Sequence, residues 1–190
     1  MARKQRQQVT AEGFLEGYIE ALTRDRHASA RWQSRKDWSD KQWTSIATRA
    51  IKAAVRSSYR KQGLAVDVAI RNDPDFYGQS EYFGIDAVGH LSDWNYPLIT
   101  VEHENGFGEA MQYALWKLLC VSADLRILIC YVDSSRRHSR WESSVNALKG
   151  GLHEVSKPHR GKKVALIVGE WEADPSTPIG WRKVYSFNRL

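Results

Sequence analysis

The sequence predicts an α/β protein in which a mixed central sheet is flanked by helices and preceded by an N-terminal helical region. Apolar residues recur at helical spacing through the first third of the chain, and apolar runs of strand length follow, separated by further helical patterns. With 190 residues, of which 42% are hydrophobic, the chain can form one core but not two full domains. We expect a helical region over residues 1–63, packed on an α/β core over residues 64–190.

Two helices are expected in the N-terminal region. Thr10 suits the N-cap of a short amphipathic helix that runs to about Leu22. Residues 23–38 are polar and without period, so we expect them to form a connecting loop. Ser39 and Gln42 then make a capping-box signature at the start of one long helix over residues 40–61.

Strand and helix patterns alternate in the rest of the chain. Strands are expected, in order, at residues 64–70, 82–88, 98–104, 125–132, 164–171 and 181–187. The first of these is an edge strand, and the second and third form an antiparallel hairpin. The fourth and fifth are almost entirely apolar, as strands buried on both faces are. Helices are expected at residues 108–121 and around residues 141–155.

The composition excludes several classes of protein. No apolar run approaches the roughly 20 residues that cross a bilayer, and the basic N-terminus leads into no apolar signal-peptide core. The two cysteines, Cys120 and Cys130, lie in apolar runs and indicate neither a disulfide framework nor a zinc site. We therefore expect a cytoplasmic protein without a membrane partner. The net charge of +6 is compatible with a polyanionic partner but does not establish one.

Acidic residues gather at the predicted hairpin. Residues two apart share a face of a strand, so Glu102 and Glu104 point one way while Val101 and His103 point the other. If the hairpin centres on Trp94, Asp86 lies opposite Glu102. Like charges directly opposite each other destabilise a sheet, so a cation is expected to neutralise them. Mg²⁺ or Mn²⁺ would suit these oxygen ligands, and Asp86, Glu102 and Glu104 are the candidate metal ligands.

The same stretch resembles the PD-(D/E)XK nuclease-like superfamily, which includes many restriction enzymes. The resemblance covers residues 82–132: Asp86 in YFGID, Glu-x-Glu in VEHEN, then a helix and an apolar strand. It implies a restriction endonuclease-like core and Mg²⁺-dependent cleavage of nucleic acid phosphodiester bonds, with DNA the expected polymer. Asp86 and Glu102 would be the metal ligands.

One position departs from the family's pattern. The usual lysine two residues after the glutamate is replaced by Glu104, which could bind metal or orient the attacking water. Lys117, on the following helix, could supply the missing positive charge, although helical geometry alone does not aim it at the site. Asp75, in the literal Pro74-Asp75 pair, is a rival first ligand ranked below Asp86 because its surroundings are rich in turn formers.

Basic residues could bind the nucleic acid backbone. On the long helix they form a ridge opposite the apolar stripe, and two basic segments follow later strands; the candidates are Arg49, Lys52, Arg56, Arg60, Arg136, Arg137, Lys162 and Lys163. A solvated helix face and solvated loops are the competing interpretations. Cleavage of both strands of a duplex would favour a two-fold homodimer.

Other residues carry weaker signals. Glu109 and Gln112 could reach the edge of the site, although a glutamate is favoured near any helix start. His103 is interpreted as a packed histidine. The tryptophans could stack on unpaired bases, with core packing as the alternative for Trp116 and for the others on helices. The competing functions are a nuclease-like protein that binds or regulates without cutting, and a protein-interaction domain.

Overall fold

The computed structural model describes residues 9–25, 40–71, 84–91, 96–105, 109–132, 164–170 and 183–186, and the single residues 146 and 150. The elements within these ranges are α1 (Ala11–Arg24), α3 (Asp40–Arg60), β1 (Asp67–Ile70), β2 (Ala87–His90), β3 (Pro97–Glu104), α4 (Glu109–Cys120), β4 (Leu125–Val132), β5 (Ala165–Glu170) and β6 (Lys183–Ser186). The predicted α/β class, with a mixed sheet flanked by helices, is confirmed.

The strands form a single six-stranded sheet in sequence order, β1 to β6, over the described residues. β1, β2 and β3 are an antiparallel meander. α4 connects β3 to β4, so β3 and β4 run parallel; β5 is also parallel to β4, and β6 returns antiparallel. β1 lies at the edge of this sheet, as expected.

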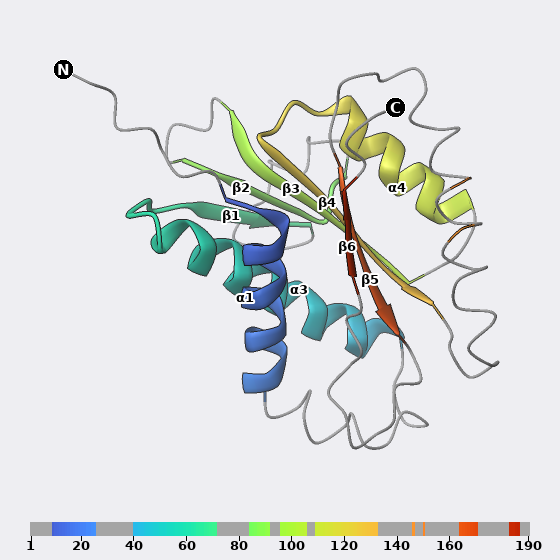
Figure 1. The fold of residues 1–190 in the computed structure, drawn as a ribbon, viewed down its shortest axis with the longest axis horizontal. Helices are drawn as coiled ribbons and strands as arrows, with labels where there is room; N and C mark the ends of the chain where they lie inside the picture. The colour runs from blue at the N-terminus through green and yellow to red at the C-terminus, as the bar shows by residue number, and fades with distance from the viewer. Residues whose placement is uncertain are drawn as a thin grey trace.

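Helices cover both faces of the sheet (Figure 1). α1 and α3 pack on one face in a cluster with Val101, Ile127 and Ile129. α4 packs on the other face, where Leu115 and Leu118 contact the apolar side chains of β4 and β5. The central strands are buried on both sides, which explains their almost continuous apolar sequences.

The two N-terminal helices follow their predicted patterns. The Thr10 side chain accepts a hydrogen bond from the Gly13 N–H at 3.1 Å and so caps α1, which continues to Arg24, two residues into the expected loop. α3 ends one residue earlier than expected, and Gly63, at φ 73°, ends the turn that follows it. Ser39 and most of the expected loop lie outside the described residues. The division at residue 63 stays a prediction.

The hairpin has the predicted register from Ala87 to Gly89, and the pairing shifts by one residue between Gly89 and His90. Its first strand is shorter at one end than expected. Ala87 pairs with Val101 and Val88 with Thr100, the pairing of a hairpin centred on Trp94. The expectation that this strand begins at Tyr82 is wrong for residues 84–86, which form a turn, and β2 begins only at Ala87. The positive φ of Gly84, 62°, breaks the extended backbone there. Asp86 therefore lies just before the strand.

The expected helix around residues 141–155 falls mostly outside the described residues, of which 146 and 150 are helical. Among the described helices, none combines the length and the apolar character needed to cross a membrane.

Candidate active site

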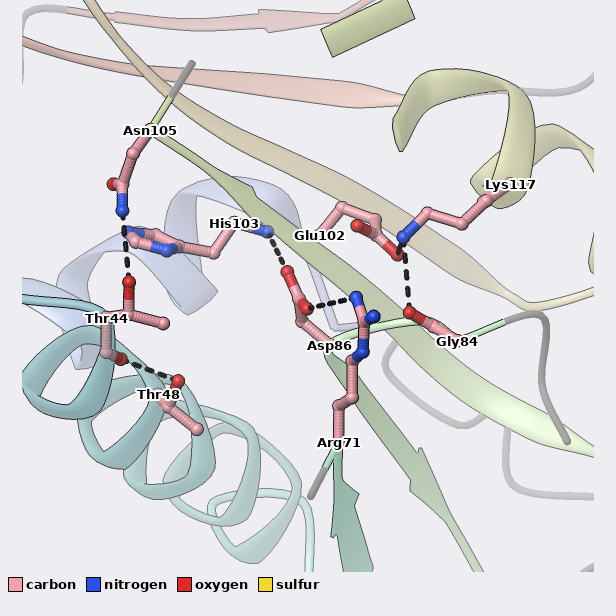
Figure 2. A network of polar contacts seen from close by, with 9 residues as sticks. All are labelled: Thr44, Thr48, Arg71, Gly84, Asp86, Glu102, His103, Asn105 and Lys117. Atoms are coloured by element: carbon pink, nitrogen blue, oxygen red, sulfur yellow. Dashed lines mark hydrogen bonds and ion pairs between the residues drawn. The ribbon is translucent and has the colours of Figure 1, made fainter. Parts of the chain in front are cut away.

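A buried ion pair joins β3 to α4. Lys117 Nζ lies 2.7 Å from Oε1 of Glu102, and the two side chains are only 6% and 3% exposed. Glu102 projects from the face of β3 that α4 covers, because its neighbour in register on β4, Leu128, belongs to the α4 cluster. Lys117 is on the sheet-facing side of α4. The ammonium group also donates a hydrogen bond to the carbonyl of Gly84 at 3.2 Å (Figure 2).

Asp86 joins this pair from the turn before β2. Its Oδ2 accepts a hydrogen bond from the backbone N–H of His103 at 2.9 Å, so the carboxylate binds β3 at a point that β2 does not reach. Its Oδ1 lies 3.9 Å from a guanidinium nitrogen of Arg71, at the end of β1. Figure 2 shows Asp86 and Glu102 on either side of β3, with Arg71 and Lys117 beside them. Four residues from separate segments thus meet at one end of the hairpin.

The carboxylates in this group have perturbed pKa values. Burial, and then the negative charge of Asp86, raise the pKa of Glu102 to about 8, against the opposing effect of Lys117. Burial also raises the pKa of Asp86, while the hydrogen bond from His103 and the charges of Lys117 and Arg71 act to lower it. The nearby cations therefore do not fully compensate for the burial of these two carboxylates. Such combinations of burial and charge are common at functional sites.

Glu104 lies further out. It is partly exposed, and its negative charge contributes to the raised pKa of Asp86. Among the residues that the structure describes, no three His, Cys, Asp or Glu side chains are grouped so that they could hold a metal ion. Glu104 does not complete such a group with Asp86 and Glu102. Lys117 is therefore brought together with two carboxylates, those of Asp86 and Glu102.

The opposite face of β3 carries a buried polar network. His103 Nε2 and the Tyr131 hydroxyl share a hydrogen bond of 2.7 Å, and that hydroxyl lies 3.4 Å from the hydroxyl of Tyr18 on α1. Trp43 of α3 packs against both rings, edge-on to Tyr131. Burial lowers the pKa of His103 to about 3, so its side chain is neutral at physiological pH. The histidine is packed, as predicted, but its backbone N–H holds Asp86.

The basic ridge of α3 is separate from this site. Arg49, Arg56 and Arg60 are exposed, as the sequence predicts, while Lys52 is partly buried. α3 packs on the sheet face opposite α4, and its exposed side points away from the sheet. Arg49 also forms an ion pair of 2.9 Å with Asp25 at the end of α1. Arg136, Arg137, Lys162, Lys163 and Asp75 lie outside the described residues.

Sequence reasoning missed two contributors. Arg71 follows an edge strand and precedes a polar stretch of sequence, and nothing in its sequence context distinguishes it from a solvated arginine. The backbone N–H of His103 could not be found from any pattern of side chains.

Glu109 and Gln112 are both exposed. The tryptophans on described helices divide, because Trp43 is buried while Trp116 is 40% exposed.

Comparisons with known proteins add little to this geometry. No model of a protein family matches the sequence, and no curated protein matches it either. Among solved structures, the chain is similar to Pyrococcus furiosus SfsA in complex with Ca²⁺, with 11% identity and a TM-score of 0.35. The match covers 80% of this chain and 64% of that one. A similarity this low carries no argument about function.

Proposed function

We propose that this chain is a metal-dependent nuclease that hydrolyses phosphodiester bonds in nucleic acid. The observation that carries the proposal is the meeting of Asp86, Glu102 and Lys117, two carboxylates and an ammonium group from three segments, in a largely buried setting. A buried ion pair contributes little net stability compared with apolar residues of the same size. The presence of this group at the end of a rigid hairpin is better explained by chemistry than by folding.

The donor set fits a hard divalent cation. Mg²⁺ commonly binds through one or two carboxylates, with water and substrate phosphate completing its coordination, and Asp86 and Glu102 are two such groups. The raised pKa of Glu102 supports this, because a nearby cation would relieve the repulsion between the two carboxylates. When bound, Mg²⁺ or Mn²⁺ would lower the pKa of a water molecule and stabilise charge on the phosphate.

The chain's own residues would orient the reaction. Asp86 and Glu102 would hold the metal on a framework fixed by the His103 N–H and by Lys117. Lys117 would provide a fixed positive charge close to the charge that develops on the phosphate. Glu104, more exposed than Glu102, could orient water at the open side of the site. Arg71, with 52% of its side chain exposed, could contact the backbone of the substrate.

The resemblance to PD-(D/E)XK nucleases agrees with these roles. The lysine that the family's motif has two residues after the glutamate is absent from β3. Lys117, from α4, lies within 2.7 Å of Glu102 and is suited to the same task. We include membership of this superfamily in the proposal, with DNA as the expected polymer.

A cleavage assay tests the proposal. Supercoiled plasmid, single-stranded DNA and RNA would each be incubated with Mg²⁺, with Mn²⁺ or with EDTA. We expect cleavage that needs the metal and that Glu102→Gln and Lys117→Met each slow by about 100-fold or more. Glutamine retains an oxygen for Lys117, which limits damage to the fold. The matched control is Glu12→Gln, at an exposed position of α1, which should leave the rate unchanged.

One observation favours a second candidate, a nuclease-like protein that binds nucleic acid without cutting it. Lys117 already forms an ion pair with Glu102, and the described residues include no three-ligand metal group. Retention of nucleic acid without cleavage under any of these metal conditions would support this candidate. Metal-dependent cleavage that persists undiminished in both site variants would contradict the assigned residues.

A further inference from the structure

Two aromatic side chains of α4 are exposed to solvent next to the buried Lys117. Tyr113 is 60% exposed and Trp116 is 40% exposed. Among the described residues, the large apolar side chains with comparable exposure are these two and Tyr96. The inner face of α4 is already provided by Met111, Ala114, Leu115 and Leu118, so the aromatic pair is not needed to attach the helix. The two rings therefore form an apolar surface that does not contribute to packing α4 on the sheet.

The two rings are already held nearly parallel to each other. The ring centroids are 5.7 Å apart and the ring planes differ by 19°, so the two side chains are stacked. Their spacing of three residues places them on the same side of the helix. A nucleobase stacks on an aromatic ring in the same parallel manner, and each stacked base contributes appreciably to binding whatever its identity.

Lys117 connects this pair of rings to the candidate active site. Its ammonium nitrogen lies 5.5 Å from the centroid of the Tyr113 ring and 2.7 Å from Glu102. Residues 113 and 117 are one helical turn apart, so the ring lies above the same ammonium group that contacts the carboxylate. The pair therefore lies within one helical turn of the residue that contacts Glu102.

From these contacts we infer that Tyr113 and Trp116 form a stacking platform for an unpaired base, and that the preferred ligand is single-stranded nucleic acid or an unpaired strand end. In a duplex, neighbouring bases already cover the base faces, so the platform would have nothing to bind. The platform would specify which nucleic acid the proposed nuclease binds. It rests on the proposed function only in that the neighbouring group of Asp86, Glu102 and Lys117 is taken to be an active site.

A protein partner fits the patch less well. Stable protein interfaces bury about 800 Å² on each partner. The neighbouring outward positions of α4 are Glu109, Ala110 and Gln112, which add no further large apolar side chain. A patch of two rings matches the size of a base or two.

The test measures binding separately from cleavage. Fluorescence anisotropy with labelled oligothymidine, oligouridine and a duplex of the same length would be recorded in EDTA, so that metal-dependent cleavage cannot occur. We expect the single strands to bind more tightly than the duplex. Trp116→Ala and Tyr113→Ala should each weaken single-strand binding by about 5- to 150-fold. Trp116→Phe, which retains an aromatic face, should restore most of the affinity.

Tyr96→Ala is the matched control, because Tyr96 is 45% exposed and lies just before β3, whereas Glu102 lies near the other end of that strand. That variant should bind like the parent chain. Equal binding of the alanine variants and the parent, or equal affinity for single strands and duplex, overturns the inference. So does a change in oligomeric state of the Trp116 variant without a change in affinity, because the pair would then be a protein interface.

Failure of the proposed function gives a different result. If no cleavage occurs with any metal but Trp116→Ala weakens single-strand binding, the stacking platform is supported and the chain is a nucleic-acid-binding protein. If the chain cleaves duplex DNA and the aromatic variants bind single strands as the parent does, the proposed nuclease function is supported and the stacking platform is contradicted. The Glu12→Gln variant, at an exposed position of α1, should retain the binding of the parent.

Discussion

At the scale of single residues, the contact between Glu102 and Lys117 is the most unusual feature of the molecule. Taking two charges out of water costs several kcal/mol per ion, and their attraction offsets this only when the geometry is good and other hydrogen bonds are satisfied. The pair is 2.7 Å apart, and Lys117 has a second acceptor in Gly84. Burial, and then the nearby negative charge of Asp86, raise the pKa of Glu102 to about 8.

This shift predicts a pH dependence of stability. The pKa of Glu102 rises from 4.5 to about 8 on folding, so between these values the folded chain binds a proton that the unfolded chain releases. Stability should therefore fall as the pH rises through this window, by at most about 1.4 kcal/mol per pH unit, and level off above it. Glu102→Gln cannot titrate and should lack this component. Urea unfolding of both proteins in EDTA, from pH 5 to about pH 9, measures the difference.

His103 acts in the opposite direction, and the design of the measurement removes its effect. Burial lowers its pKa to about 3, so below the usual histidine range the unfolded chain takes up a proton that the folded chain does not, and stability falls with falling pH. Both proteins contain His103, so its contribution cancels when their free energies of unfolding are subtracted. Parallel stability curves for the two proteins would show that Glu102 is not perturbed.

At the scale of elements, the short β2 strand creates the site. Because β2 begins at Ala87, the N–H of His103 on β3 has no strand partner on that side and binds the Asp86 side chain instead. Had the strand begun at Tyr82, Asp86 would be one more residue of a ladder, with its side chain directed by the pleat. The turn at Gly84 also directs a carbonyl at Lys117. The positive φ of Gly84 thus affects the positions of both Asp86 and Lys117.

A second glycine of the hairpin, Gly89, leads to a prediction about packing. A Cβ at this position would lie 2.7 Å from Cγ2 of Ile99 and 2.8 Å from Cγ1 of Val55, both on stiff branched side chains in the core. We expect Gly89→Ala to lower the free energy of unfolding by about 1–3 kcal/mol through overpacking. Chemical denaturation checks this.

Gly13→Ala is the matched control for that substitution. A Cβ there meets only the Thr10 hydroxyl, at 3.5 Å, and alanine is the better helix former, so α1 should be unchanged or slightly more stable. A Gly89→Ala protein as stable as the parent would mean that α3 can move away from β2 at little cost.

At the scale of the whole molecule, the N-terminal helices are part of the core. Phe14 and Tyr18 of α1 are fully buried in the cluster that also contains Val101 and Ile127 of the sheet. The hydrogen-bonded series from His103 through Tyr131 to Tyr18 extends from β3, which carries Glu102, to α1. The layers therefore share both apolar contacts and polar ones.

This packing predicts that the α/β core does not fold without α1. Deleting residues 1–25 would expose the apolar surface under Phe14, Tyr18 and Leu22, and should give a protein that aggregates or lacks cooperative thermal unfolding. Solubility and near-ultraviolet circular dichroism are the measurements. Deletion of residues 1–8, which leaves the Thr10 cap and α1 intact, is the control and should unfold like the parent. A cooperative transition in a fragment of residues 64–190 would establish the predicted boundary at residue 63 as that of an independent domain.

The sequence by itself determined the class of fold, the succession of the described elements, the hairpin register from Ala87 to Gly89 and the face on which Glu102 projects. These follow from local rules: the periods of helix and strand, capping at Thr10, and the constraint that a one-residue slip would turn every side chain of a strand over. The resemblance of YFGID and VEHEN to a nuclease motif also needed nothing beyond the printed letters.

Only the tertiary structure decided that Lys117, fifteen positions after Glu102, completes the group, that Arg71 and the His103 N–H bind Asp86, and that Glu104 stays outside. It also placed the basic ridge of α3 on the far side of the sheet and left Trp116 in solvent while burying Trp43. The physical reason is that periodicity assigns a residue to a face of its own element. The distance between two elements, and the group that meets a charge across that distance, depend on how the layers pack.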